Sequence, residues 1–360
     1  MRLLVQVGGV IVALGLLAWC VSLALREENR GALERLRDAP GEWLVTLVAL
    51  SLASLALNGL GFTLTLRRVA RVRALDVQAT NAVATALGYL PFKLSMIARV
   101  VYHHRRDGVP LMTIGGWLGA NAALILIVLL PLAGAGVWRA ALDGPYLAAA
   151  GGGIALLAGA AFAFARLFGG PAGLERLRAL ARGLGSGLAD RLMARPAFRN
   201  LHAGLGILGH APTVACVMGV RLADILVQSL RFVVVGRALE MPLPTEKAVL
   251  AASTFFLTGA ASPAGSLGAR EGVTTGVGAL VQIPGVPYDA LSVITLAVSA
   301  AEIVVYVPVA ALAFLYLRLR PGPAAVTAGT PGRPGTPPAR PYDPPHATGA
   351  DPAQPDRRRP

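Results

Sequence analysis

A run of small and polar residues in the second half of the chain carries the groups best suited to binding an anion. The run extends from Ser262 to Glu271 and reads SPAGSLGARE. Proline and glycine release backbone groups from helical hydrogen bonds, so these groups and the serine hydroxyls can point at a ligand. Arg270 offers a planar fork of donors that matches a phosphate or a carboxylate. The predicted ligand-binding residues of this run are Ser262, Pro263, Gly265, Ser266, Gly268, Arg270 and Glu271.

A structural role is the alternative interpretation of this run. The segment then forms the tight turn of a helical hairpin, and Glu271 neutralises the neighbouring Arg270. Glu271 can also pair with an arginine from the first half of the chain.

The first half of the chain contains a similar interruption, GYLPFK at residues 88–93, followed by Arg99. We predict that Pro91, Lys93 and Arg99 form a second wall of the anion site. Asn81, earlier in the same segment, can hydrogen-bond across it. The alternative is that both cations extend to the membrane surface while their stems stay in apolar surroundings.

Four further polar residues lie within apolar stretches, where an ionisable side chain is energetically costly and therefore a functional candidate. Asp224, Gln228 and Arg231 recur on one helical face and can line a polar pathway. Glu302 lies deep in the last apolar stretch and is predicted to be buried against protein, with Arg270 as a candidate partner. A structural role is equally open, in which Asp224 pairs with Arg231 through Gln228.

Aromatic residues and histidines near the ends of the apolar stretches have simpler predicted roles. His103 and His104 lie in a basic segment and are predicted to be solvated. Trp138 and Tyr306 are predicted to be anchors at the membrane–water interface.

Composition predicts the elements that position these residues. The chain has 360 residues, 55% of them hydrophobic, and a mean hydropathy of +0.61. Several apolar runs reach the roughly 20 residues that span hydrocarbon. We therefore predict an all-α polytopic membrane protein with about six full transmembrane helices, the first being a retained signal anchor. Their predicted ranges are 3–25, 44–66, 112–132, 147–168, 213–235 and 290–317.

The arginines predict which loops face the cytoplasm, because basic loops stay on that side. The net charge is +14, and lysine contributes only at two positions. The basic regions are 67–77, 99–107, 166–212 and the tail that begins at Arg318. All four face the cytoplasm only if segment 78–98 enters the membrane and returns as a re-entrant hairpin. By the same logic segment 248–283 is a second hairpin that enters from the opposite side, and both termini are cytoplasmic.

Short matches between the two halves predict an internal duplication. Three matches occur in the same order, the last two at equal spacing: RALDV 73–77 with RALEM 237–241, GVP 108–110 with GVP 285–287, and Pro131 with Pro308. Each half then reads span, span, hairpin, span, and the halves have opposite orientation. Inverted-topology repeats with interrupted helices are typical of transporters whose site lies near the bilayer midplane.

The chain divides into four predicted regions. Residues 1–168 hold the first repeat and the start of the second, in spans one to four. Residues 169–212 form a basic cytoplasmic linker, which either lies on the anionic inner leaflet or is solvated. Residues 213–320 hold the remaining spans and the second hairpin. Residues 321–360 contain 12 of the 26 prolines and are predicted to be a disordered cytoplasmic tail rich in proline and arginine.

Several functional classes find no support in the sequence. Cys20 and Cys216 lie within predicted spans and indicate neither disulfides nor a metal site. No P-loop, zinc signature or dinucleotide fingerprint is present, so no cofactor is predicted. The positive charge borders membrane spans, where it sets topology and contacts headgroups rather than nucleic acid. No nucleophile–base pair is visible, so no catalytic residue is predicted.

Around these residues the chain resembles the family typified by the transmembrane region of lysylphosphatidylglycerol synthase, also described as flippase-like integral membrane proteins of uncharacterised function. The resemblance spans about residues 5–318. One hallmark is a proline, a Gly-rich turn and an ending similar to Gly-Arg-Glu, matched by residues 263–271. The other is a proline shortly before an arginine, matched by Pro91 and Arg99. The resemblance implies a role in moving or handling an anionic or aminoacylated lipid.

The chain also departs from the family pattern. Ser266 and Ala269 stand where glycine is more common, and Met-Ile-Ala at 96–98 replaces a pair similar to Gly-Asp. The last span has Glu302 and no arginine nearby. Bifunctional members carry a soluble C-terminal domain that aminoacylates the lipid, and residues 321–360 are not expected to form one, so no synthase activity is predicted.

Taken together, the residues and the resemblance predict a lipid flippase or transporter of a bacterial-type plasma membrane. An anionic lipid headgroup binds between the two hairpins, and the halves rock to expose it to each leaflet in turn. Movement is passive or driven by an ion gradient, with Asp224, Glu271 and Glu302 as candidate proton carriers. Two alternatives stay open: a non-catalytic partner of another membrane protein, and an enzyme that modifies lipid headgroups with Glu271 as general base.

Overall fold

The structure, a computed structural model, describes residues 2–90, 93–139, 141–183, 191, 193, 195, 198, 201–262, 266–281 and 288–320. Within these residues all regular secondary structure is helical, which confirms the predicted all-α class. Among the described residues, five helices are long and apolar enough to cross a membrane. They are α3 (Gly41–Leu66), α6 (Leu111–Arg139), α7 (Gly144–Phe168), α12 (Ala211–Ala238) and α15 (Tyr288–Leu319).

Shorter helices complete the fold. The first predicted span corresponds to α1 (Arg2–Ala24), whose stretch from Ile11 to Ala24 is a shorter apolar helix. The 3-10 turn η1 (Glu27–Asn29) follows it. The remaining helices are α2 (Arg30–Arg37), α4 (Ala74–Leu87), α5 (Leu94–Arg105), α8 (Gly170–Gly183), α11 (Leu205–Leu208), α13 (Thr245–Ala261) and α14 (Ala269–Val281).

The long helices present apolar side chains outward. In α7 only 6% of the most apolar 18 residues are buried inside the protein, and Leu147 and Leu156 are 63% and 72% exposed. Such a surface would associate in water, whereas hydrocarbon solvates it. The protein is therefore a multi-pass membrane protein.

Local chemistry ties α6 to α7. The carboxylate of Asp143 accepts a hydrogen bond from the backbone N–H of Tyr146 at 2.9 Å and so caps the first turn of α7. Arg139, the last residue of α6, pairs with the same carboxylate. Hydrogen bonding from Arg139 lowers the pKa of Asp143, so the carboxylate stays charged as the cap.

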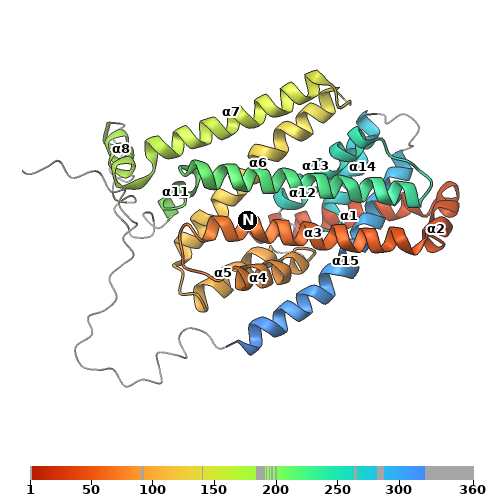
Figure 1. Cartoon of the computed structure of the whole chain (residues 1–360), viewed down its shortest axis with the longest axis horizontal. Coiled ribbons are helices and arrows are strands. Elements are labelled where there is room, and N and C mark those ends of the chain that lie inside the picture. The colour runs from red at the N-terminus through yellow and green to blue at the C-terminus, as the bar shows by residue number, and fades with distance from the viewer. Residues whose placement is uncertain are drawn as a thin grey trace, which may run out of the picture. The chain divides into compact units, whose positions relative to one another are not determined.

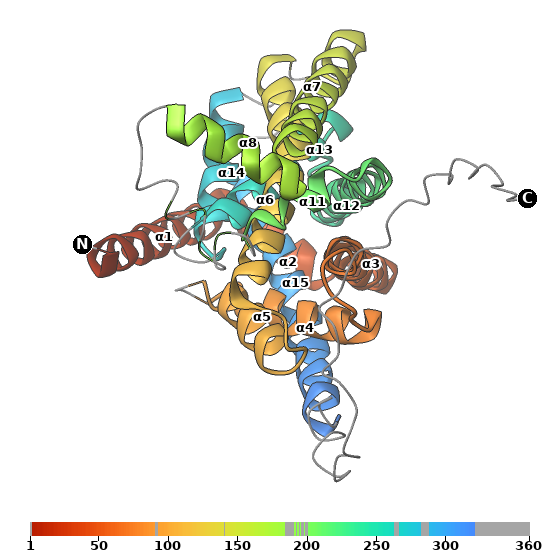
Figure 2. The ribbon, with the colours of Figure 1, turned by 90° about the vertical axis from the view of Figure 1, so that its left-hand side faces the viewer.

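Two pairs of short helices are distinct from the long ones. In the first α4 packs against α5 (Figure 2), and in the second α13 packs against α14. These four helices have 14, 12, 17 and 13 residues, or about 18–26 Å of helix, against a hydrocarbon core of about 30 Å. Residues 99–105, predicted as a loop, are the second half of α5, so Arg99 lies within a helix.

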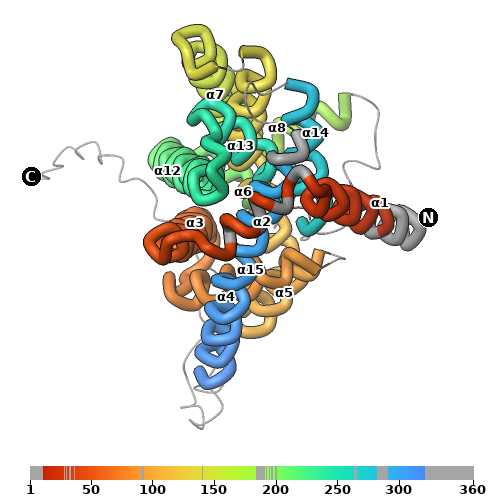
Figure 3. Tube along the Cα trace, turned by 90° about the vertical axis from the view of Figure 1, so that its right-hand side faces the viewer, coloured from red at the N-terminus to blue at the C-terminus, as the bar shows by residue number. Residues whose placement is uncertain are grey.

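The order and the contacts of the elements repeat along the chain. Helix α3, the pair α4–α5 and α6 are followed later by α12, the pair α13–α14 and α15. Helix α4 contacts α15 and α13 contacts α6, so each pair packs against a long helix of the other half. Helices α3 and α12 run side by side and join the two halves (Figure 1). Helix α1 lies against α14 and α15 (Figure 3).

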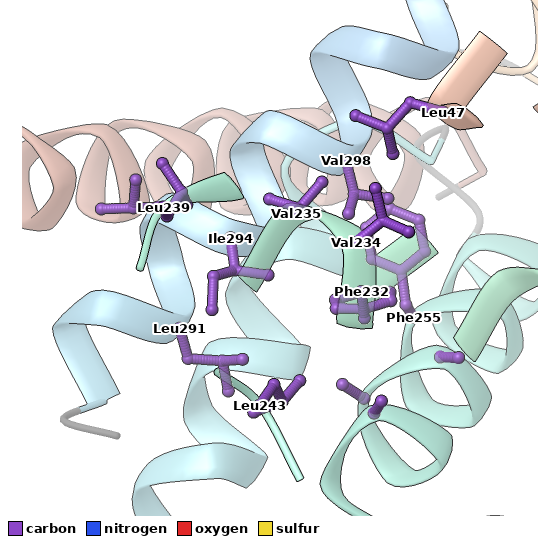
Figure 4. Close-up of a cluster of buried hydrophobic side chains, with 14 of the residues drawn as sticks. Leu47, Phe232, Val234, Val235, Leu239, Leu243, Phe255, Leu291, Ile294 and Val298 are labelled. Carbon is purple, nitrogen blue, oxygen red and sulfur yellow. The ribbon is translucent and has the colours of Figure 1, made fainter. Parts of the chain in front are cut away.

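Buried apolar clusters hold the long helices together. In one cluster, formed mainly by α12, α13 and α15, the rings of Phe232 and Phe255 meet edge to face with centroids 5.6 Å apart (Figure 4). A second cluster surrounds Trp117 and joins α6 to α3, α11 and α12. Lipid is as apolar as these side chains, so close packing rather than a hydrophobic driving force stabilises such contacts.

Two residues that were predicted to lie at the surface are buried. His103 is only 1% exposed, because its Nδ1 lies 2.6 Å from a carboxylate oxygen of Asp107 and its ring packs edge-on against Trp117. The prediction of a solvated His103 is therefore wrong, whereas His104 is exposed. Tyr306 is 4% exposed and lies in the interior rather than at an interface.

Close packing at Gly116 gives a test of the fold. A methyl group there would overlap the carbonyl oxygen of Leu201 and lie within 3.2 Å of the Gly204 backbone. Gly119, almost one turn further along α6, is exposed and has no neighbour within 4 Å. We expect Gly116→Val to lower the free energy of unfolding by about 1–3 kcal/mol through overpacking, and the matched Gly119→Val to have little effect. Thermal unfolding in detergent measures both, and equal Tm values would contradict this packing.

Candidate functional site

A cavity of about 490 Å3 lies between the two pairs of short helices. Its walls come from both pairs and from α3, α6, α12 and α15. The cavity brings together predicted site residues from both halves of the chain. Those that line it are Lys93, Arg99, Gln228, Ser262, Ser266, Arg270 and Glu302.

The two helix pairs touch at this cavity. Ser266 donates from both its backbone N–H and its hydroxyl to the carbonyl oxygen of Gly88, each at 3.0 Å. Lys93 donates to the carbonyl oxygen of Ala260 at 3.4 Å. Lys93 precedes α5 with a φ of 54°, the left-handed conformation that turns the chain sharply. The polar runs predicted in the two halves therefore face each other.

Arg270 is the centre of a buried ion-pair network. Its Nε donates to Glu271 at 2.9 Å and its Nη1 donates to Glu302 at 2.7 Å. Its Nη2 donates to the hydroxyl of Ser299 at 3.2 Å, and that hydroxyl donates in turn to Glu271. Every nitrogen of this guanidinium has a protein partner. The pairing of Arg270 with Glu271, which was the structural alternative for this run, is therefore present, as is the pairing with the candidate partner Glu302.

Glu302 is shared by two arginines and a tyrosine. Besides Arg270 it contacts Arg231, with 2.6 Å between Nη2 and Oε1. The hydroxyl of Tyr89 donates to Oε2 at 2.9 Å. The guanidinium of Arg270 lies between two rings, 4.8 Å from the centroid of Tyr89 and 4.2 Å from that of Phe255. Charge pairing and cation–π contacts together stabilise these buried charges.

Asp224 joins this network through intermediate groups. Ser54 donates to Asp224 at 2.6 Å, Gln228 donates to Ser54 at 2.9 Å, and Arg231 donates to Gln228. The predicted link from Asp224 to Arg231 through Gln228 is present, with Ser54 of α3 as an additional member. The carboxylate that pairs directly with Arg231 is Glu302, because α15 packs against α12.

Arg99 and Lys93 have different partners from Arg270. Arg99 donates to the amide oxygen of Asn81 at 2.8 Å and lies 4.3 Å from the ring centroid of Phe62. Among the residues that the structure describes, no carboxylate lies within ion-pair distance of either Arg99 or Lys93. The cavity wall therefore carries two positive charges that these residues do not offset.

Gly268 forms the turn that places Arg270 and Glu271. Its φ of +84° is readily adopted only by glycine, and its N–H donates to Glu271 at 2.6 Å. The predicted site residues Pro91, Pro263 and Gly265 lie outside the described residues.

Polar residues of this region that were not among the predicted site residues include Ser54, Tyr89, Arg221 and Ser299. Arg221 is 2% exposed and lies one turn before Asp224 in α12. Arg221 could have been identified from the sequence, because it is a charged residue inside the apolar run 213–235. Ser54 and Tyr89 carry no such signal, because their roles depend on helices that meet only in the folded chain.

The cavity offers positive charge and hydrogen-bond donors to a ligand. Lys93 and Arg99 present cationic groups, and Ser262 and Ser266 add hydroxyls. Ionised donors of this kind bind phosphate and carboxylate oxygens strongly. In the described part of the chain, no cluster of three or more His, Cys, Asp or Glu side chains could hold a metal ion.

The turn at Gly268 can be tested with a matched glycine of the next helix. A methyl group on Gly268 would be strained by the positive φ and would overlap the carbonyl oxygen of Ala13 in α1. Gly276 is helical and has no neighbour within 4 Å. We expect Gly268→Ala to cost more than about 1 kcal/mol of stability, whereas Gly276→Ala stabilises by up to about 1 kcal/mol. The Tm of each variant is measured in detergent. Equal shifts in Tm for the two variants would contradict this turn geometry.

Comparison with known proteins identifies the family of the chain. The chain matches the family model described as Lysylphosphatidylglycerol synthase TM region over residues 6–315, a range that includes every residue lining the cavity. No curated protein and no solved structure is significantly similar to the chain. The chain belongs to the family of lysylphosphatidylglycerol synthase transmembrane regions.

Proposed function

We propose that the protein binds the headgroup of an anionic phospholipid in this cavity and moves the lipid between the leaflets of a bacterial-type plasma membrane. The observation that carries the proposal is the pair of cavity-lining cations, Arg99 and Lys93, without a carboxylate partner among the described residues. A buried or half-buried charge is costly unless an opposite charge offsets it. An anionic headgroup supplies that charge. The proposal includes no chemical step.

The charge balance of the cavity supports an anionic ligand rather than a cationic one. The charges of Arg231 and Arg270 are offset by Glu302 and Glu271, which contact them directly. This cluster is neutral as a whole. The excess positive charge belongs to the first helix pair, where Lys93 and Arg99 lie, and a cationic ligand would be repelled there.

The cavity size supports a headgroup rather than a whole lipid. A volume of about 490 Å3 falls within the range of small-molecule sites, roughly 300–1,000 Å3. Two acyl chains exceed that space, so they stay in the surrounding bilayer. The exposed apolar faces of the long helices are suited to contact with those chains.

The two short helix pairs support a mechanism of alternating access. We infer that α4–α5 and α13–α14 are re-entrant hairpins of two inverted repeats, because their helices are short, their tips meet at the cavity, and each packs on a long helix of the other half. Irregular backbone at membrane depth is tolerated where it lines such a cavity. Rocking of one repeat against the other exposes the headgroup to each leaflet in turn.

Removing the cations of the first helix pair tests the binding step. We expect Arg99→Gln to lower the affinity for phosphatidylglycerol about tenfold, because a charge-assisted hydrogen bond is lost, and Lys93→Gln to lower it in the same direction. Arg105→Gln serves as the control, because Arg105 is exposed at the end of the same helix. Native mass spectrometry in detergent with phosphatidylglycerol and phosphatidylcholine measures the preference.

Movement of the lipid between leaflets is measured separately in proteoliposomes. They contain a fluorescent phosphatidylglycerol that a membrane-impermeant reductant quenches. We expect the wild type and Arg105→Gln to accelerate its exchange between leaflets and Arg99→Gln to do so less. Affinity and exchange that are the same in all variants would exclude this headgroup site.

A further inference from the structure

Arg221 is a buried arginine whose hydrogen-bond donors have no partner. It is 2% exposed, and its Nε, Nη1 and Nη2 all lack a hydrogen-bond acceptor. Asp224 is 3.9 Å away, which is within ion-pair distance and beyond hydrogen-bond distance. The facing oxygen of Asp224, Oδ2, is likewise without a donor. Buried polar groups are hydrogen-bonded in the great majority of cases, so a guanidinium with three vacant nitrogens requires an explanation.

Phe62 stands next to both Arg221 and the cavity. Its ring centroid lies 5.5 Å from the guanidinium carbon of Arg221 and 4.3 Å from that of Arg99. Phe62 and Arg99 line the cavity, whereas Arg221 does not. The backbone of α3 leaves room for the guanidinium at Gly61, where a methyl group would come within 3.3 Å of Nη2. The ring of Phe62 is thus the common neighbour of two like charges, of which Arg99 lines the cavity and Arg221 does not.

We propose that Arg221 is a second phosphate-binding arginine, closed off by the ring of Phe62 in the structure and reached when that ring moves aside. Arg99 and Arg221 then contact the phosphate of the bound headgroup from two sides. This inference rests on the proposed function and names the part of the lipid that is recognised. Each guanidinium is a planar fork of donors, and a phosphate has several acceptor oxygens. Two such groups therefore favour a phosphate over an anion that has a single acceptor.

The electrostatics of the closed arrangement favour such a movement. Two guanidinium groups that share one neighbouring ring repel each other in a medium of low dielectric constant. A phosphate between them removes that repulsion and supplies acceptors for the vacant nitrogens of Arg221. Phe62 packs edge-on against Trp117, with centroids 5.5 Å apart, and borders the cavity, which offers space for the displaced ring.

Asp224 explains how Arg221 stays buried without the ligand. Its carboxylate offsets the charge of Arg221 at 3.9 Å but uses none of the donors. Ser54 of α3 holds the other carboxylate oxygen at 2.6 Å. Arg221 is therefore neutralised in the closed arrangement while its hydrogen-bonding capacity stays available for a ligand.

A mutant cycle tests the proposal without any requirement for transport. Phe62→Ala, or Phe62→Leu if the alanine variant does not fold, removes the ring. Arg221→Gln is combined with Asp224→Asn so that no uncompensated carboxylate remains. Binding of phosphatidylglycerol to the full-length protein in detergent is measured by native mass spectrometry for the wild type, each change and their combination. Binding of inorganic phosphate to the same proteins is measured in parallel by isothermal titration calorimetry. Only variants with matched Tm are compared.

We expect removal of the Phe62 ring to raise the affinity for phosphatidylglycerol about tenfold, and the Arg221→Gln and Asp224→Asn changes to abolish that gain. If the gain persists in the combined variant, or if no variant differs from the wild type while Arg99→Gln still weakens binding, Arg221 is not a ligand group and the inference is wrong. A gain with inorganic phosphate alone would overturn the assignment to a lipid headgroup. If Arg99→Gln also leaves binding unchanged, the proposed function itself fails.

Discussion

The structure depends on the position of Glu302 between Arg231 and Arg270. These three charges lie in α15, α12 and α14, and all are less than a tenth exposed. Removing one partner of a buried pair leaves an uncompensated charge, which costs about 3–5 kcal/mol. The helices therefore have to meet where the charges cancel. Through the hydroxyl of Tyr89 the same carboxylate also reaches the first helix pair, so one glutamate fixes the wall that both halves of the chain share.

That constraint divides the arginines of the cavity into two kinds. Arg270 on the second helix pair is saturated by carboxylates, a hydroxyl and two rings. Arg99 on the first pair has an amide, the backbone carbonyl of Ser95 at 3.5 Å and one ring, but no carboxylate among the described residues. Both were predicted as ligand-binding residues because both follow a proline within an apolar stretch. A sequence pattern shows which side chains enter the membrane interior. Whether each then meets a carboxylate depends on which helices cross there.

Much of this fold and part of the site could be predicted from sequence. Apolar length predicts the long helices, and the cost of buried charge predicts that intramembrane ionisable residues gather, as Arg231, Arg270 and Glu302 do. The individual partners could not be predicted. Arg231 pairs with Glu302 rather than with Asp224 because α12 packs on α15. The burial of His103 could not be predicted for a related reason. Its neighbours in sequence are mostly basic, while the folded chain buries its ring against Trp117 and brings the carboxylate of Asp107, four residues further on, to its Nδ1.

The interface of α3 and α12 contains both hydrogen-bonded polar groups and polar groups without a hydrogen-bond partner. It carries the hydrogen-bonded chain from Asp224 to Arg231, while Arg221, Asp224 and Arg231 each keep buried atoms without a hydrogen-bond partner. A satisfied polar network rigidifies an interface, whereas vacant donors and acceptors raise its energy and are relieved by any ligand or rearrangement that fills them. Because α3 and α12 belong to different halves of the chain, a change in the interactions at this interface changes the energy of the contact between the halves. Under the proposed alternating access, an anion that binds this interface more tightly in one arrangement of the two halves shifts the equilibrium toward that arrangement.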